Sequence, residues 1–149
     1  MARRIQGSAV TVRKTLPTEE EEQMAFVKWC HLKGLITQHA ANEIGGSIGA
    51  MKAKAIKNKR MGTTAGFPDL LIFIPIRNTI DHDVDSYQIV AIEMKRKKGG
   101  RLSPEQRQWL DIFEMAGIPN RVCKGASEAI SYIETIMQDI VSYYPGSEV

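Results

Sequence analysis

The chain of 149 residues contains 43% hydrophobic and 25% charged residues and carries a net charge of +3. These values are typical of one soluble globular domain, and they exclude wholesale disorder and the fibrous classes of protein. No apolar run approaches the roughly 20 residues that span a bilayer, and the basic N-terminal stretch has no signal-peptide core, so we expect a cytoplasmic protein without a membrane segment.

The first predicted elements are an N-terminal arm and a helix. Residues 1–17 show no clear periodicity, and we interpret them as a flexible arm that precedes a single domain over residues 18–149. Thr18 is a suitable helix N-cap with Glu21 three residues later, which is a capping-box pattern. Apolar residues at helical spacing continue to Cys30, so the sequence predicts a helix here.

Three strands and a loop are predicted in the middle of the chain. A short strand is predicted within residues 35–42, and the Gly- and Lys-rich residues 43–66 are interpreted as a loop or a mobile surface element. Residues 70–74 form an uninterrupted apolar run, which is typical of a central strand covered on both faces. Residues 87–95 are predicted to form the third strand.

The last third of the chain is predicted to contain two helices with a strand between them. Ser103, Pro104 and Gln106 supply the N-cap, the first-turn proline and the capping-box glutamine of one helix. An edge strand is predicted over residues 120–123, and a wide apolar face at helical spacing after Ser127 predicts the last helix. The element order is α-β-β-β-α-β-α, which indicates an α/β fold.

The two cysteines and two of the histidines are interpreted as structural residues. Cys30 and Cys123 lie far apart in apolar patterns, which suits buried free thiols better than a disulfide or a zinc site. His39 lies in a strand-like patch and His82 in a polar turn, so neither receives a catalytic role.

The predicted hairpin brings acidic residues together if its strands pair antiparallel around residue 81. Residues whose numbers add to about 162 then stand opposite each other, as Asp69 and Glu93 do, with Cβ atoms roughly 4.5–5.5 Å apart. Two such carboxylates can hold a hard cation such as Mg²⁺, and Lys95 lies on the same face as Glu93. A one-residue change of register would separate the carboxylates, so the prediction depends on this pairing.

Two carboxylates and a lysine at this spacing meet the requirements of phosphodiester hydrolysis. A metal lowers the pKa of a bound water and screens the phosphate, and an ammonium group orients that water or neutralises the developing charge. The alternative is a solvated charge pattern on the strand, with Asp69 as a turn residue after Pro68. Spacing by itself leaves both interpretations open.

Basic residues gather in two clusters that are candidates for phosphate contacts. The first cluster comprises Lys52, Lys54, Lys57, Lys59 and Arg60, and the second comprises Lys95, Arg96, Lys97, Lys98 and Arg101. Such clusters suit an anionic partner such as DNA. The alternative for each cluster is a solvated surface without a ligand.

Three sequence blocks follow one another in order, namely residues 66–71 (GFPDLL), 91–96 (AIEMKR) and 100–106 (GRLSPEQ). In these motifs the chain resembles the VRR-NUC family, a branch of the PD-(D/E)XK nucleases, over residues 18–129. The resemblance implies a restriction-endonuclease-like fold, in which helices flank a central mixed β-sheet. It also implies a deoxyribonuclease that depends on Mg²⁺ or Mn²⁺ and acts on the DNA backbone.

The resemblance implies a role for each residue of the central motifs. Asp69 and Glu93 are expected to bind the metal, and the backbone carbonyl of Met94 is expected to add a ligand. Lys95 is expected to assist the attacking water.

Further site residues are implied outside those motifs. The family's first helix supplies a glutamate, for which Glu19 is the first candidate and Glu20 the second. Gln106 matches a family residue beside the active site, with helix capping as the alternative, since we expect one amide not to serve both roles. Asn42 and Glu43 resemble a step that some members place near the metal.

Small stand-alone members of phage or bacterial type resemble homodimeric junction-resolving enzymes, because two cuts in a branched DNA need two sites. The resemblance therefore implies a homodimeric, structure-selective endonuclease that cleaves four-way (Holliday) junctions in a bacterial or phage-infected cell. The apolar last helix, with Tyr143 and Tyr144 after it, is a candidate interface, and closure of the core is the alternative. Alternative functions are a flap, nick or end-processing nuclease in phage replication or repair, and a non-catalytic DNA-binding module.

Overall fold

A five-stranded mixed β-sheet forms the centre of the protein in a computed structural model that describes residues 16–40 and 48–149. The strands are β1 (Ile36–His39), β2 (Leu70–Asn78), β3 (Val84–Lys95), β4 (Asn120–Lys124) and β5 (Ser147–Glu148). Their order is β1-β2-β3-β4, and β5 pairs with the far end of β2. Only β3 and β4 run parallel, while the other pairs are antiparallel.

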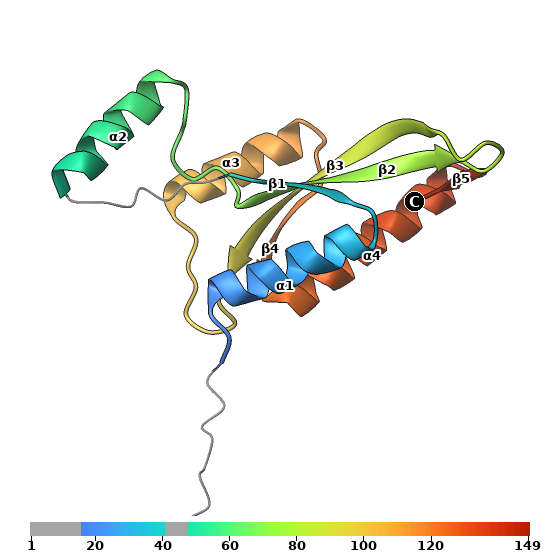
Figure 1. The fold of residues 1–149 in the computed structure, drawn as a ribbon, viewed down its shortest axis with the longest axis horizontal. Helices are drawn as coiled ribbons and strands as arrows, with labels where there is room; N and C mark the ends of the chain where they lie inside the picture. The colour runs from blue at the N-terminus through green and yellow to red at the C-terminus, as the bar shows by residue number, and fades with distance from the viewer. Residues whose placement is uncertain (1–15, 41–47) are drawn as a thin grey trace, which may run out of the picture.

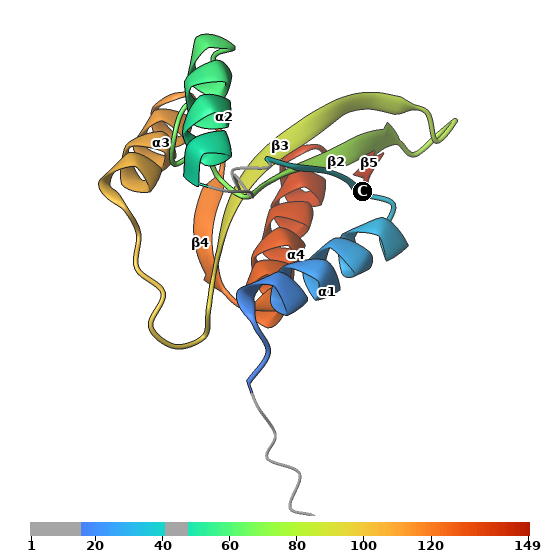
Figure 2. The same cartoon turned by 60° about the vertical axis from the view of Figure 1, so that its left-hand side comes forward.

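Helices flank this sheet on both faces, as the family resemblance implied. They are α1 (Glu19–Leu32), α2 (Ile48–Arg60), α3 (Pro104–Met115) and α4 (Ala126–Tyr143). Figures 1 and 2 show α1 and α4 side by side on one face and α3 on the other, while α2 stands away from the sheet. The predicted α/β fold class is therefore confirmed. Among the helices of the described residues, none combines the length and the apolar character that a membrane span requires.

The core lies between the sheet and the layer formed by α1 and α4. Alternate residues of β2 are fully buried there because successive strand residues point to opposite faces. The largest buried side chains of the core are Phe26, Leu70, Ile72, Ile74, Val90, Ile92, Met94 and Ile133. Cys30 and Cys123 are buried free thiols, as predicted, and burial raises the pKa of each thiol to about 12.

The pairing of β2 with β3 follows the register predicted from the sequence. Leu70 stands opposite Ile92, and the pairing keeps this register as far as Ile76 and Ser86, after which it shifts at an irregularity. Asp69 comes directly before β2, so the same register places it opposite Glu93. The end of the hairpin that carries Asp69 and Glu93 is thus set by regular strand pairing.

Two helix starts have the predicted capping boxes. Thr18 accepts a hydrogen bond from the main-chain N–H of Glu21, whose side chain accepts one from the N–H of Thr18 at 2.7 Å. Ser103 and Gln106 form the same reciprocal pair at the start of α3. Each pair satisfies N–H groups that a helix start leaves free.

The segment 43–66 differs from its predicted loop because it contains α2. Residues 48–60 include several alanines and lysines and no proline, which suits a helix. Without an apolar stripe facing a core, this helix gave no periodic signal. The short strand β5 was also not predicted, because two residues are too few to form an alternating pattern. Asn42, Glu43 and most of the predicted arm lie outside the described residues.

Candidate active site

The ends of β2 and β3 bring the predicted acidic residues together. The main-chain N–H of Met94 donates a hydrogen bond of 2.8 Å to Oδ2 of Asp69, so this carboxylate is fixed to the neighbouring strand. Glu93 and Lys95 are both buried at the end of β3, and Lys95 Nζ donates to Oε1 of Glu93 at 2.5 Å. Antiparallel pairing therefore assembles the site from segments 24 or more residues apart in the sequence.

Glu93 is the most enclosed charged side chain of the site, with 1% of its surface exposed. Its Oε1 accepts hydrogen bonds from Lys95 Nζ and from Nε2 of Gln106. Its Oε2 is buried and has no hydrogen-bond partner in the described part of the chain. A buried carboxylate oxygen without a partner is costly, so this oxygen calls for a cation or a donor from beyond the described residues.

The two acidic side chains are held in an environment that disfavours negative charge. Burial raises the pKa of Glu93 to about 7 against the hydrogen bond from Lys95, and the charge of Asp69 raises it further. Burial also raises the pKa of Asp69, although the Met94 N–H and the charge of Lys95 act in the opposite direction. A divalent cation between these carboxyls would favour their ionised forms.

These residues fit a hard divalent cation. Within residues 16–40 and 48–149, no three His, Cys, Asp or Glu side chains form a cluster that could hold a metal ion. Mg²⁺ does not require such a cluster, because it commonly binds one or two carboxylates, keeps several waters and contacts substrate phosphates. Asp69 and Glu93, with the unpartnered oxygen of Glu93, supply that kind of donor set.

Gln106 serves both of the roles that we expected to exclude each other. Its Oε1 accepts a hydrogen bond from the N–H of Ser103 at 2.9 Å, while its Nε2 donates to Glu93. The expectation of incompatibility was wrong because the two ends of one amide point to different partners. The start of α3 is thereby joined to the buried carboxylate of β3.

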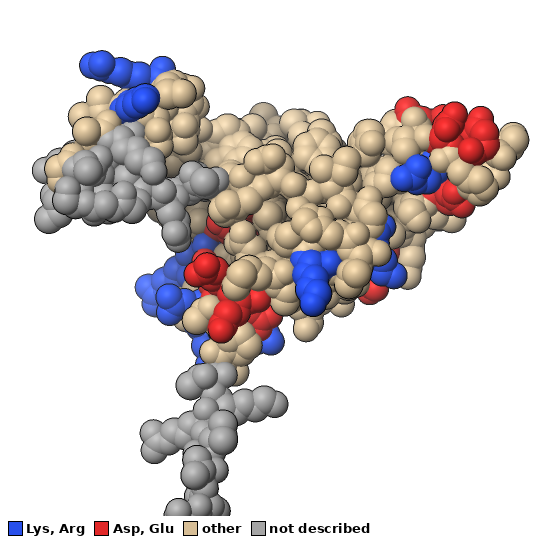
Figure 3. Space-filling model, in the orientation of Figure 1, with Lys and Arg blue, Asp and Glu red and all other residues tan. Residues whose placement is uncertain are grey.

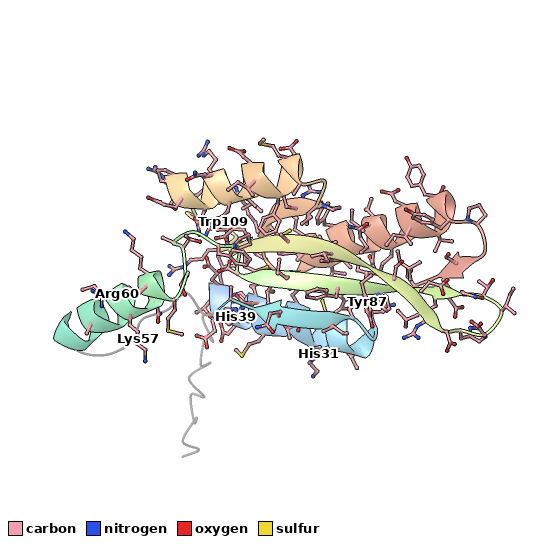
Figure 4. The ribbon with its side chains drawn as sticks, turned by 90° about the horizontal axis from the view of Figure 1, so that it is seen from above. His31, His39, Lys57, Arg60, Tyr87 and Trp109 are labelled. Atoms are coloured by element: carbon pink, nitrogen blue, oxygen red, sulfur yellow. The ribbon has the colours of Figure 1, made fainter. Side chains whose placement is uncertain are left out.

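A glycine and an aromatic cluster hold the loop before Asp69 against α3. Gly66 has a left-handed backbone with φ of +81°, and a Cβ there would lie 2.5 Å from the main-chain N of Gln106. Trp109, visible in Figure 4, donates from Nε1 to the carbonyl of Ala65 at 3.1 Å. Phe67 packs edge-on against Trp109 with ring centroids 4.9 Å apart. The sequence motif around Asp69 thus includes residues that position the site, a role that its spacing alone did not reveal.

The first helix brings Glu19 to the site. Oε2 of Glu19 accepts a hydrogen bond of 3.0 Å from the main-chain N–H of Arg96, directly after β3. The charge of Glu19 is also among the causes that raise the pKa of Asp69. Glu20 is exposed, so the geometry favours Glu19 as the helix-borne carboxylate.

A different glutamate of α1 is buried and was missed by the sequence analysis. Oε2 of Glu22 accepts from the N–H of Ala126 at 2.7 Å, and Oε1 forms an ion pair with Lys97 at 2.8 Å. Gly125 leaves room for this contact, because a Cβ at Gly125 would lie 2.7 Å from Lys97 Cε. Lys97, which was predicted to contact DNA, is exposed but forms this ion pair within the protein.

The remaining basic candidates are exposed. Arg96, Lys98 and Arg101 border the site on the segment between β3 and α3, and Lys57, Lys59 and Arg60 lie on the detached α2. Figure 3 shows acidic and basic side chains gathered around the start of α1, with further basic side chains on α2. The side chains of Lys52 and Lys54 lie outside the described part of the structure.

Comparisons with known proteins indicate the family of the chain. A search of curated proteins gave no match. The chain is similar to a solved structure of a VRR_NUC domain protein, with 26% sequence identity and a TM-score of 0.61 over 83% of this chain and 91% of the other. The family model of the VRR-NUC domain matches residues 6–127. The chain therefore belongs to the VRR-NUC family of nuclease domains, and DNA is its substrate.

Proposed function

We propose that this protein is a metal-dependent DNA endonuclease whose reacting groups are Asp69, Glu93 and Lys95. The observation that carries the proposal is the assembly of these three side chains at one end of the β2–β3 pair. The unpartnered Glu93 oxygen and the raised pKa of both carboxyls support a divalent cation there. We expect this cation to be Mg²⁺ or Mn²⁺, held by Asp69 and Glu93 with the carbonyl of Met94.

Each residue of the site has its own role in hydrolysis. When bound, the cation lowers the pKa of a coordinated water and screens the charge of the phosphate. The Met94 N–H keeps Asp69 in place, and Gln106 holds Oε1 of Glu93 so that Oε2 stays directed to the site. Lys95 supplies an ammonium group that orients the attacking water and neutralises charge in the transition state. Glu19 completes the acidic surface from α1.

The preferred substrate in this proposal is a four-way DNA junction, cut by a homodimer. Membership in the VRR-NUC family supports a DNA substrate, and paired cuts across a junction need two sites related by symmetry. Exposed apolar side chains at the end of α4 supply a surface for such a dimer, since Tyr143 is 80% and Tyr144 59% exposed. Aromatic residues of this kind are common at protein interfaces.

A cleavage assay tests this function and ranks its substrates. Labelled four-way junction, flap, nicked and linear duplex DNA would be incubated with the protein in Mg²⁺, Mn²⁺ or EDTA. We expect cleavage in either metal, none in EDTA, and the highest rate on the junction. Preference for flaps or nicks would favour an end-processing nuclease, and cleavage in EDTA would contradict metal dependence.

The oligomeric state and paired cleavage are measured separately. Light scattering should give twice the mass of the 16.7 kDa chain. A supercoiled plasmid with an extruded cruciform should give linear product without full accumulation of nicked circles. A stable monomer that nicks first would contradict paired cleavage.

A further inference from the structure

A groove between α1 and β1 leads to the candidate active site. Its volume is about 890 Å³, and it reaches from Glu19 at the start of α1 to His31 and Leu32 at its end, with Asp69 and Arg96 also in its wall. Lys28 adds a further basic side chain from α1. This α1–β1 groove joins the acidic site to basic side chains along the helix.

His39 lines this groove at the end of β1, beside Asp69. Figure 4 shows His39 and His31 along the border of α1 and β1. Nδ1 of His39 lies 2.9 Å from the main-chain oxygen of Asp69 and 3.1 Å from Nε2 of Gln23. The N–H of Ala40 donates to the same Asp69 oxygen at 3.0 Å. The ring is thus fixed to the backbone of a candidate catalytic residue.

This contact determines which ring nitrogen can act on a ligand. Nδ1 lies against both Nε2 of Gln23 and the main-chain oxygen of Asp69. When Nδ1 accepts from Gln23, the ring proton is on Nε2, which can then donate to a ligand. In the described residues no hydrogen bond uses Nε2 of His39, although the side chain is exposed in the groove. Engagement of one imidazole nitrogen by a backbone group commonly orients the other toward a substrate or a metal.

We propose that the α1–β1 groove is a binding subsite for the DNA strand beside the cleaved bond, and that Nε2 of His39 donates to a phosphate oxygen of that strand. The proposal rests on the nuclease function proposed above. Glu19, Glu20 and Asp69 also line the groove, so a phosphate there requires donors close by. His39 supplies a donor beside Asp69, and Lys28 and Arg96 supply positive charge.

Two substitutions separate this role from a structural one. In His39→Asn, the short amide replaces Nδ1 and can keep the contact with Asp69 or Gln23, while the position of Nε2 is empty. In His39→Gln, the longer amide reaches the position of Nε2 but loses the contact made by Nδ1. His82→Asn is the matched control, because His82 lies on the distant β2–β3 turn with φ of 62°, a conformation that Asn tolerates.

Equilibrium binding of four-way junction and duplex DNA in EDTA is the primary readout, so that no strand is cut. We expect His39→Asn to weaken binding by about tenfold or more, as loss of a hydrogen bond to a charged group does. His39→Gln should stay within about threefold of the wild type, and His82→Asn should match it. The reverse order, with Gln weaker than Asn, would assign His39 a purely structural role and overturn the proposal.

Substitution of single phosphates locates the contact on the DNA. Neutral methylphosphonate would replace one phosphate at a time around the mapped cleavage position. The wild type should bind DNA less tightly when the neutral group replaces one particular phosphate next to the cut. His39→Asn should bind that modified DNA as tightly as it binds unmodified DNA, because it no longer contacts this phosphate. An equal loss in both proteins at every position would overturn the subsite.

Different results would contradict the proposed nuclease function and the proposed subsite. If wild-type protein cuts no DNA in Mg²⁺ or Mn²⁺, the proposed function and the subsite are both wrong. If wild-type protein cuts DNA, Asp69→Asn does not, and His39→Asn binds and cuts as the wild type does, only the subsite is wrong.

Discussion

Charged side chains are buried at the ends of β2 and β3, whereas the basic side chains described on α2 are exposed. At the strand ends, Glu93 and Lys95 are buried, and Oε1 of Glu93 accepts hydrogen bonds from Lys95 and Gln106. On α2, Lys57, Lys59 and Arg60 are exposed, and the helix stands away from the sheet in Figures 1 and 2. One region is rigid and desolvated, whereas the other is surrounded by solvent.

The difference reflects the two tasks of a nuclease. Bond cleavage needs groups fixed to a fraction of an ångström in a site with little water, which the sheet and α3 provide. Attraction of a DNA backbone needs positive charge but little fixed geometry, because phosphate contacts are largely independent of sequence. The predictions below test whether catalysis and binding are divided between these regions.

The largest effect is expected from the strand ends. Asp69→Asn, Glu93→Gln and Lys95→Ala should each lower the cleavage rate by roughly a thousandfold or more, because each removes a group that acts in the transition state. DNA affinity should stay within about threefold, since other basic residues make most phosphate contacts. Single-turnover cleavage and equilibrium binding measure the two quantities.

Exposed residues of α3 provide controls for these variants. Asp111→Asn and Glu114→Gln make the same chemical changes on the solvent side of α3 and should leave cleavage unchanged. Wild-type cleavage by Lys95→Ala would contradict the assignment of the site.

The buried carboxyl should also make stability depend on pH when no metal is bound. The pKa of Glu93 is raised from 4.5 to about 7 in the folded state, so the folded protein binds this proton more tightly than the unfolded chain. The resulting stability is fully present below pH 4.5 and is lost as pH rises through about 7. Its size is roughly 3 kcal/mol in the free energy of unfolding.

Urea unfolding in EDTA from pH 4 to pH 8 measures this effect as a difference between wild type and Glu93→Gln. The free energy of unfolding of the wild type should fall as the pH rises through about 7, and that of Glu93→Gln should not. Mg²⁺ should restore the stability of the wild type at high pH and should not change that of the variant. Parallel curves for the two proteins would show that Glu93 titrates normally.

A smaller effect on cleavage is expected at the start of α3. Ser103→Ala removes the hydroxyl that accepts from the main-chain N–H of Gln106 but leaves the Gln106 contact with Glu93. Gln106→Ala keeps that hydroxyl and removes both side-chain hydrogen bonds of Gln106, to the N–H of Ser103 and to Glu93. Each variant should lose about 1 kcal/mol of stability. Only Gln106→Ala should also lower cleavage, by about tenfold or more, since it removes one of the two donors to Oε1 of the charged Glu93. If the two variants cleave DNA at the same rate, Gln106 acts only as a helix-capping residue.

The smallest effect is expected on α2. The triple variant Lys57→Ala, Lys59→Ala and Arg60→Ala should weaken binding by about tenfold and flatten the dependence of log K on log salt. Its cleavage rate at saturating protein should not change, because α2 is outside the catalytic site. A Lys33→Ala control changes a lysine that contacts the ring of Trp29. An unchanged salt slope would identify the α2 cluster as solvated surface.

Local patterns were sufficient for the central part of the fold. The apolar run after Asp69 and the capping boxes at Thr18 and Ser103 involve neighbouring residues, and each was found where it was predicted. The register of β2 with β3 was predictable because the two strands are joined by one short connection, whose centre near residue 81 sets which residues stand opposite each other. Helix α2 was missed because, in the described part of the structure, it stands away from the sheet, and no core contact there imposes a periodic pattern on its sequence.

The sequence by itself determined the central strands, the capped helices and the three motif blocks, because these depend on residues close together along the chain. Only the tertiary structure decided that Gln106 reaches Glu93, that Lys97 is paired with Glu22, and that the ring of His39 rests on the backbone of Asp69. Each of these contacts joins elements whose distance is set by how helices pack on the sheet. Charge and spacing along one chain carry no information about that distance, so the sequence could not show that Lys97, within a run of exposed basic residues, forms an ion pair with the buried Glu22.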